Sequence, residues 1–174
     1  LRLKDSQIYL SSSELHGGAI SCVSSYVEVV NSDIYNNSSE MGGAIFVDPT
    51  SECLIDNVSF NNNGANNGGA IATLEGSKLT VQDSEFSGNT ASGFIQSSDP
   101  DFPVYGGGGA IYQEFSDTLR ISNTNFLSNT ASVSPGGAIA SYHGVKIILH
   151  HVDIRDNESL GAGGGLAFFR TENI

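Results

Sequence analysis

One short segment near the end of the chain holds the side chains best suited to acid–base chemistry. It contains two histidines, two aspartates and an arginine: His150, His151, Asp153, Arg155 and Asp156. Polysaccharide-cleaving enzymes use clustered carboxylates to hold Ca²⁺ or to activate water, and a nearby cation to stabilise developing charge. Such a cluster works only when a neighbouring segment supplies an apposed partner. The elements that surround this segment therefore decide its role.

Other residues give weaker signals for chemistry. Asp99 and Asp101 could contribute to a Ca²⁺ site, but two carboxylates do not make a cage. The two cysteines, Cys22 and Cys53, lack the clustered spacing of a zinc site, and no Gly-x-Ser-x-Gly turn supports a catalytic serine. We therefore expect no metal and no cofactor.

The composition excludes several classes of partner. The 174 residues carry a net charge of −12 and only seven lysines and arginines, whereas phosphate binding requires a basic surface. No apolar run approaches the roughly 20 residues that span a bilayer. We expect no nucleic-acid partner and no membrane-spanning segment. The 21 glycines and the low charged fraction of 15% favour many short strands and turns.

A tetrapeptide repeat organises the whole chain. Gly-Gly-Ala-Ile occurs at residues 17–20, 42–45, 68–71, 108–111 and 136–139, and a degenerate copy occurs at 163–166. The copies begin 25, 26, 40, 28 and 27 residues apart. A glycine pair permits a positive φ, or a tight corner where a Cβ would collide with the next repeat. The pairs are Gly17 and Gly18, Gly42 and Gly43, Gly68 and Gly69, Gly108 and Gly109, and Gly136 and Gly137.

A second repeated unit precedes each glycine pair and consists of an Ile or Phe followed three positions later by a small polar residue. The apolar anchors are Ile8, Ile34, Phe60, Phe86, Phe126 and Ile154. The polar residues are Ser11, Asn37, Asn63, Asn89, Asn129 and Asn157. Five of these six are Asn, which predicts an amide column when repeats stack.

Two further apolar columns lie seven and five residues before the anchors, and this spacing of two indicates a strand. The first column comprises Leu1, Val27, Cys53, Leu79, Leu119 and Ile147, and the second comprises Leu3, Val29, Ile55, Val81, Ile121 and Leu149. Position minus three holds residues suited to a turn, namely Asp5, Asn31, Asn57, Asp83, Asn123 and His151. Each repeat is thus predicted to form a strand, a turn, a short strand, a turn and a glycine-led strand.

These columns predict an all-β fold, a right-handed parallel β-helix of about six coils. A helical alternative fails because glycine pairs would interrupt every helix. On stacked coils the positions beside the acid–base cluster are Asn123, Asn125 and Ser128, which offer no carboxylate. We therefore expect no enzyme, and the alternative is a polysaccharide-degrading β-helix enzyme, pectate lyase-like or glycoside hydrolase-like.

The 40-residue interval predicts an inserted loop near residues 92–105. Its aromatic residues Phe94, Phe102 and Tyr105 suit recognition on a loop stiffened by prolines. The alternative is that they cover a flank of the β-helix. Two other questions concern modification: Cys22 and Cys53 either form a disulfide across a turn or stay as free buried thiols, and Asn36 and Asn57 are the better placed glycosylation sequons.

The tandem Gly-Gly-Ala-Ile and Phe-x-x-Asn motifs resemble the repeats of the chlamydial polymorphic outer-membrane protein family. Three units carry both motifs in full, those that begin at Phe60, Phe86 and Phe126, whereas Ile8, Ile34 and Ile154 depart from the pattern. Similar repeats occur in extracellular proteins of other bacteria, protists and algae. The resemblance implies a surface-displayed passenger β-helix, extracellular at the outer membrane of a cell, that acts as an adhesin.

From these observations we expect residues 1–174 to be a single β-helix segment of a longer repeat protein. Its role is adhesion, or that of a structural spacer or filament component. The partners would be a protein or glycan receptor, or neighbouring subunits of an extracellular assembly.

Overall fold

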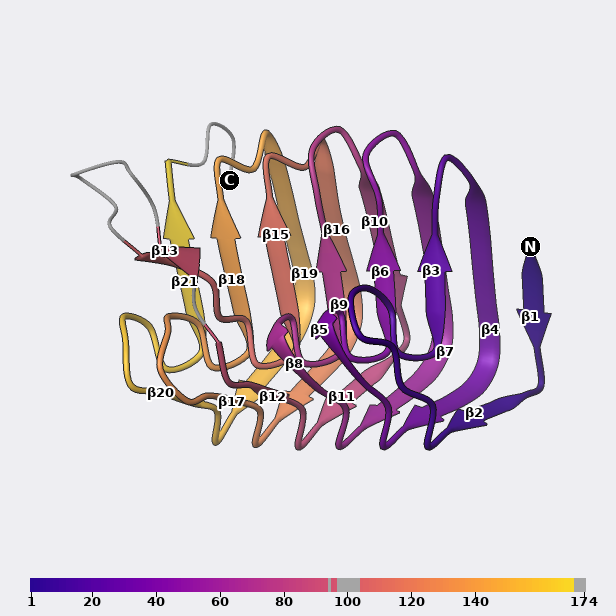
Figure 1. The fold of residues 1–174 in the computed structure, drawn as a ribbon, viewed down its shortest axis with the longest axis horizontal. Helices are drawn as coiled ribbons and strands as arrows, with labels where there is room; N and C mark the ends of the chain where they lie inside the picture. Colours follow the sequence, from indigo (N-terminus) through magenta and orange to yellow (C-terminus); the bar gives the residue numbers. More distant parts are fainter. Residues whose placement is uncertain (94, 97–103, 171–174) are drawn as a thin grey trace.

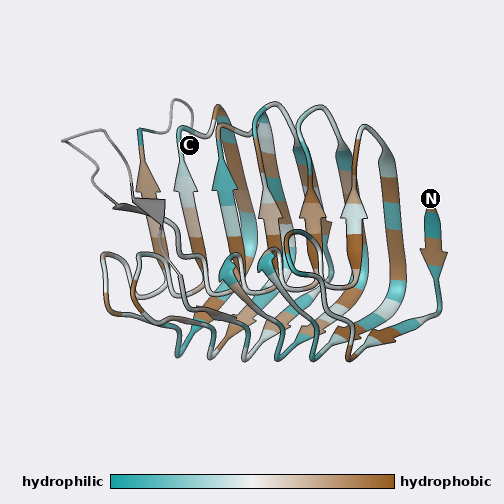
Figure 2. Ribbon diagram, viewed as in Figure 1, coloured by the Kyte–Doolittle hydropathy of each residue, from teal (hydrophilic) through white to brown (hydrophobic). Residues whose placement is uncertain are grey.

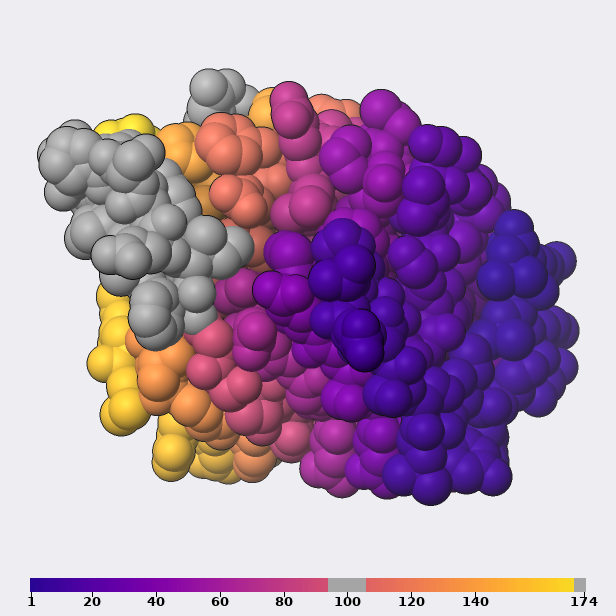
Figure 3. Space-filling view, in the orientation of Figure 1, coloured from indigo at the N-terminus to yellow at the C-terminus, as the bar shows by residue number. Residues whose placement is uncertain are grey.

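A computed structural model describes residues 1–93, 95–96 and 104–170. Every regular element within these residues is a β-strand, and the strands stack along one axis as successive coils (Figure 1). A space-filling view shows the coils as consecutive bands from the N-terminal to the C-terminal end (Figure 3). The predicted parallel β-helix of about six coils is confirmed. No helix in the described part of the chain could cross a membrane.

The long sheet carries the predicted apolar columns. Its strands pair in parallel and in the predicted register, with Val27 beside Cys53, Val29 beside Ile55 and Ile34 beside Phe60. Burial alternates along the long strands of the middle coils, and hydropathy alternates in the same way (Figure 2). The strands are β1 (Arg2–Lys4), β2 (Gln7–Tyr9), β4 (Tyr26–Tyr35), β7 (Glu52–Asn61), β10 (Lys78–Gln82), β11 (Glu85–Ser87), β16 (Thr118–Leu127) and β19 (Lys146–Arg155).

The glycine-led sheet forms a second wall. Its strands are β3 (Ile20–Cys22), β6 (Ile45–Val47), β9 (Ile71–Thr73), β15 (Ile111–Glu114), β18 (Ile139–Tyr142) and β21 (Leu166–Phe169). The isoleucines of the Gly-Gly-Ala-Ile units form one stacked inner column. Residues beside them are also buried: Phe46, Tyr112 and Tyr142 form a second apolar cluster with Ala72 and Ala140. This wall is therefore buried on both faces over its middle coils.

A third, short sheet lies where the sequence pattern predicts a turn after each Asn. Its strands are β5 (Ser38–Met41), β8 (Gly64–Asn67), β12 (Thr90–Ala91), β17 (Thr130–Ala131) and β20 (Glu158–Ser159), all paired in parallel. The prediction of a turn was wrong because stacking supplies the hydrogen-bond partners that small residues of low β propensity would not hold alone. Asn66 lies in β8 and is exposed.

The interior is a set of stacked apolar columns. Phe60, Phe86 and Phe126 are fully buried, and their rings stack with centroids 4.7 Å and 4.8 Å apart and planes within 7°. Offset stacking of aromatic rings adds to the free energy of burial, which is about 1.5–3 kcal/mol for each large apolar side chain. The columns thus form one continuous core along the axis.

The glycine pairs form the tight corner that the sequence predicts. The first glycine has a positive φ, for example 65° at Gly42, which residues with a Cβ rarely adopt. The second glycine lacks room for a Cβ, because a Cβ on Gly43 would overlap the carbonyl oxygen of Gly69 on the next coil. Each member of the pair therefore has its own reason to be glycine.

The asparagine column forms an inner ladder of hydrogen bonds. The Nδ2 of Asn63 donates to Oδ1 of Asn89, 3.0 Å away, and to the carbonyl oxygen of Ile34. Its Oδ1 accepts from both the backbone N–H and Nδ2 of Asn37, each at 3.0 Å. The same bonds link consecutive members of the column Asn37, Asn63, Asn89, Asn129 and Asn157. Each central amide is therefore satisfied without water.

The insertion between the third and fourth glycine pairs is described only in part. Strands β13 (Ile95–Gln96) and β14 (Val104–Tyr105) pair in an antiparallel hairpin. Phe94 and Phe102, and Asp99 and Asp101, lie outside the described residues, as does the side chain of Tyr105. The hydroxyl of Tyr142 donates to the carbonyl oxygen of Gly106, so the end of the insertion contacts the glycine-led sheet.

The hypothesis of a disulfide is wrong in this structure, since Cys22 and Cys53 are both free and buried. The thiol of Cys22 donates to the carbonyl oxygen of Ser25. Cys53 lies in an inner column between Val27 and Leu79. Each thiol therefore acts as a small buried hydrophobe, the alternative left open by the sequence. Burial raises the pKa of both thiols.

A candidate binding groove on the long sheet

The long sheet bends at the polar column three residues before the anchors. All six residues of this column have a left-handed backbone, with φ between 48° and 53°: Asp5, Asn31, Asn57, Asp83, Asn123 and His151. Asn and Asp tolerate this conformation because their short side chains bond to local groups. The sequence predicted a turn at this column, but the structure has a bend within continuous strands. Four ten-residue strands continue through the bend: β4, β7, β16 and β19.

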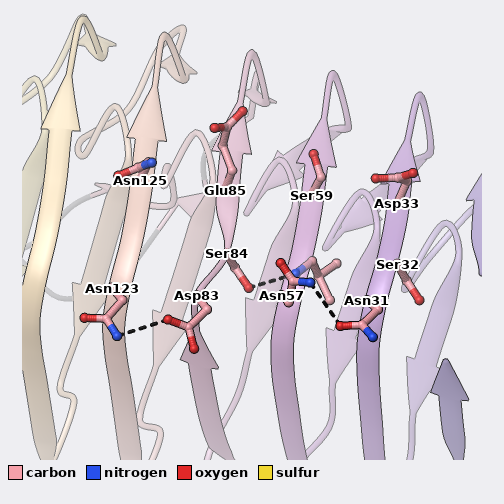
Figure 4. Close-up of a pocket in the computed structure, with 11 residues that line it drawn as sticks. Asn31, Ser32, Asp33, Asn57, Ser59, Asp83, Ser84, Glu85, Asn123 and Asn125 are labelled. Atoms are coloured by element: carbon pink, nitrogen blue, oxygen red, sulfur yellow. Dashed lines mark hydrogen bonds between the residues drawn. The ribbon is translucent and has the colours of Figure 1, made fainter. Parts of the chain in front are cut away.

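The outer side of this bend is hollowed into a groove of about 670 Å³. Two rows of polar side chains line it across four consecutive coils (Figure 4). The bend row comprises Asn31, Asn57, Asp83 and Asn123, and the second row comprises Asp33, Ser59, Glu85 and Asn125. Ser32, Val58 and Ser84 lie between the rows and are 4%, 2% and 6% exposed. The groove is therefore a continuous trough along the axis of the β-helix.

Buried hydroxyls fix the backbone beneath the groove. Ser84 Oγ accepts from the backbone N–H of Val58 and donates to the carbonyl oxygen of Gln82. Thr124 Oγ1 accepts from the N–H of Ser84 in the same way, at 3.4 Å, and donates to the carbonyl oxygen of Ser122. These bonds join one coil to the next at the bend. The two rows of side chains consequently stand on a fixed support.

The bend row forms an outer ladder that is interrupted once. Asn31 Nδ2 donates to Asp5, Asn57 Nδ2 donates to Asn31, and Asn123 Nδ2 donates to Asp83. An ionised Asp83 carries no hydrogen to donate, so nothing in the row bridges it to Asn57. Two acceptors thus face each other at the middle of the groove, with no donor between them.

The free groups of the groove are mainly acceptors. Within the described residues, Glu85 has no hydrogen-bond or ion-pair partner, and Asn57 Oδ1 accepts no hydrogen bond. Asp33 accepts only one weak bond, from Gln7 Nε2 at 3.3 Å. None of the lysines and arginines in the described chain lines the groove. In the part of the chain that the structure describes, the groove therefore presents three carboxylates with no cation to neutralise them.

The acid–base cluster at the other end of the sheet has a different geometry. Arg155 Nη2 lies 2.8 Å from the Asp153 carboxylate, so this carboxylate is ion-paired. The rings of His150 and His151 contact each other, with centroids 3.8 Å apart. Their neighbours on the adjacent coil are neutral, since Ser122 pairs with His150 and Asn125 pairs with Asp153. The cluster is thus confined to a single coil.

The described residues contain no group of three or more His, Cys, Asp or Glu side chains placed to hold a metal ion.

The glycosylation sequons lie in different environments. Asn37 and Asn157 belong to the inner ladder, whereas Asn57 lies in the groove and donates to Asn31. Asn36 is exposed at a corner with φ of 55°, and its side chain makes no hydrogen bond within the described residues.

Sequence reasoning identified the bend row as a turn but missed the groove. The signal that marks it is the second row, two residues after each bend residue. In the coil register this row reads Gln7, Asp33, Ser59, Glu85, Asn125 and Asp153, polar at every coil. A polar column beside a bend column is therefore the pattern that predicts such a trough.

Comparisons with known proteins agree with this architecture. The family model described as a right-handed beta helix region matches residues 17–174. No curated protein and no solved structure matches the chain. The matched residues include the six glycine-led strands and all the coils that line the groove. The chain belongs to the right-handed β-helix family.

Proposed function

We propose that this chain is an extracellular, surface-displayed β-helix segment that works in adhesion, through the polar groove along its long sheet. The observation that carries the proposal is the groove itself, which crosses four coils without interruption on a support fixed by buried hydroxyls. A rigid, preformed surface binds an extended ligand without a large cost in ordering. The resemblance to chlamydial polymorphic outer-membrane protein repeats supports the same role at a cell surface.

The alternative is a polysaccharide-degrading enzyme of the same fold. Against it, the Asp153 carboxylate is ion-paired to Arg155, and the adjacent coil presents neutral groups to the acid–base cluster. We expect no release of reducing sugar from polygalacturonate above a protein-free blank, with or without added Ca²⁺. A release that disappears in Asp153→Asn would establish the enzyme instead.

A structural spacer is the second candidate, and the inner ladder favours it. Hydrogen bonds run without a gap from Asn37 to Asn157 and lock each coil to the next. Such a solenoid holds a surface at a fixed distance even when it binds nothing. Adhesion and spacing separate in a direct assay of attachment.

The test uses beads coated with the protein and applied to cultured epithelial cells and to films of extracellular-matrix proteins. Beads coated with albumin, and beads coated with the guanidinium-unfolded chain, serve as controls. We expect severalfold more attached beads with the folded protein, and competition by the same protein in solution. Attachment no greater than that of albumin beads would leave the spacer role in place of adhesion.

A further inference from the structure

We infer that the groove binds an extended protein segment through arginine or lysine side chains spaced three residues apart. The inference rests on the proposed function and names the chemistry of its partner. Three features of the groove carry it: the balance of donors and acceptors, the distribution of charge and the spacing of the carboxylates.

The middle of the groove offers mainly acceptors, beside the hydroxyl of Ser59 and the amide of Asn125, which can also donate. Asn57 Oδ1, the Asp83 carboxylate and the Glu85 carboxylate have no intramolecular donor among the described residues, apart from the bond of Asn123 to one oxygen of Asp83. A guanidinium group carries five donors and no acceptor, and an ammonium group carries three. A sugar hydroxyl is both donor and acceptor, and would leave part of this set unmatched. The acceptor cluster therefore fits a basic side chain better than a neutral glycan.

The charge of the groove selects the same ligands. Among the described residues, Asp33, Asp83 and Glu85 lie in it without a neighbouring lysine or arginine, whereas four carboxylates elsewhere have a basic partner within 4.0 Å. An anionic polymer such as polygalacturonate would be repelled. The net charge of −12 would speed the approach of a cationic segment. Charge-assisted bonds from arginine to a carboxylate are also stronger than neutral ones.

The spacing of the carboxylates indicates an extended chain along the axis. Asp33 lies in β4 and Glu85 lies in β11, and one coil, that of Ser59 in β7, separates them. Coils stack about 4.8 Å apart, so the two carboxylates are about 10 Å apart along the axis. In an extended polyproline II segment, which has three residues per turn, side chains three residues apart lie on the same face and about 9 Å apart. Basic residues three apart would therefore meet Asp33 at one end of the groove, and Asp83 with Glu85 at the other.

The test measures fluorescence anisotropy of a labelled Gly/Ser octapeptide that carries two arginines three residues apart. Matched probes replace both arginines with glutamine, or place them side by side. The groove variant is D83N/E85Q, whose side chains keep the original shapes. The control variant is E40Q/E75Q, which removes two exposed carboxylates from the short sheet and from a turn and changes the net charge equally. Thermal melting verifies that both variants fold.

We expect the protein to bind the spaced arginine peptide, with affinity at least tenfold lower in D83N/E85Q and within twofold of the original in E40Q/E75Q. Binding should weaken as salt increases and should be lost with the glutamine probe. An equal loss of affinity in the two variants would mean that net charge alone explains the binding, and would overturn the inference. Equal affinity for the probe with adjacent arginines would overturn it as well.

Other ligands complete the test. Spermine, a glucosamine hexamer without acetyl groups and CaCl₂ are titrated as competitors of the peptide. Any of them that binds more tightly than the peptide, with the same dependence on Asp83 and Glu85, would replace the protein segment as partner. If the protein does not bind the peptide, but D83N/E85Q abolishes bead attachment, this inference is refuted and adhesion stands. No attachment at all would count against the proposed function itself.

Discussion

Two columns of polar side chains, one of Asn and one of Asn and Asp, run along the same coils and behave in opposite ways. The inner column, Asn37 to Asn157, is buried over its central members, and every central amide bonds to both neighbours. The outer column, Asp5 to Asn123, is exposed and is broken between Asn57 and Asp83. The residue types are almost the same, and the surroundings differ.

The difference shows what each column can do for the molecule. A buried amide that loses its partner suffers the full cost of desolvation, so the inner column fixes the register of the coils. An exposed amide exchanges its partner for water at little cost, so the outer column can leave groups open for a ligand. We therefore expect the inner column to govern stability and the outer column to govern binding.

The largest expected effect comes from breaking the inner ladder with Asn63→Ala. This change leaves the backbone N–H of Asn37 without its acceptor, removes one of the two bonds donated by Asn37 Nδ2, and removes the amide bond to the carbonyl oxygen of Ile34. Each unsatisfied buried group costs about 1–3 kcal/mol, so we expect a loss of about 3 kcal/mol or more in the free energy of unfolding. Guanidinium denaturation followed by circular dichroism measures the shift.

Asn66→Ala is the matched control for that change. Asn66 lies three residues away in β8, is exposed, and its side chain makes no hydrogen bond within the described residues. We expect its free energy of unfolding to lie within about 0.5 kcal/mol of the original. Equal midpoints for the two variants would refute the role of the inner ladder.

The second prediction concerns the thiols, which report whether the interior is closed to water. Burial raises the pKa of Cys22 and of Cys53, which lowers the thiolate fraction at neutral pH, and the thiolate is the reactive form. We expect both to react with a thiol reagent at least a hundredfold more slowly in the folded protein than in guanidinium. Reaction of Cys53 at the unfolded rate would show that the inner columns open readily.

Much of the fold was predictable because its signals recur at each coil. The glycine pairs, the anchors and the Asn column are particular in chemistry, and six copies fixed the register that the strands adopt. The short sheet was not predictable in the same way. Strands such as Thr90–Ala91 and Thr130–Ala131 are too short and too polar to alternate, and they pair only because the coils bring them together.

The groove was less predictable than the fold, for a related reason. Its two rows are polar and exposed, so no apolar pattern marks them, and their residues vary from Asp33 to Ser59 to Glu85 between coils. What places them side by side is the left-handed bend, and the sequence shows only that Asn and Asp suit it. The acid–base cluster was conspicuous in sequence because it is contiguous, yet the paired positions on the adjacent coil, Ser122 and Asn125, give it no apposed carboxylate.

The third prediction is that the outer ladder contributes little to stability. Asn57→Ala removes the bond to Asn31 at an exposed position and leaves both groups accessible to water. We expect a change below about 0.5 kcal/mol, apart from a small effect at the bend, since Ala tolerates the φ of 53° less well. Asn57→Gly removes the same amide without that strain. If the free energy of unfolding falls by several kcal/mol in both variants, the outer column stabilises the fold as much as the inner column does.

The smallest expected effect is a gain, from repair of the outer ladder with Asp83→Asn. The new Nδ2 can donate to the free Oδ1 of Asn57, and removal of one carboxylate reduces repulsion in a groove that holds Asp33 and Glu85. The bond from Asn123 becomes weaker when its acceptor loses its charge, so the net gain should be only about 0.3–0.5 kcal/mol. A double-mutant cycle with Asn57→Gly isolates the new bond, because the part of the gain that depends on Asn57 must disappear when its amide is absent. A gain of the same size in both backgrounds would assign the effect to charge alone. If Asp83→Asn instead lowers stability, the missing bond between Asp83 and Asn57 does not weaken the outer ladder, and Asp83 stabilises the bend in another way.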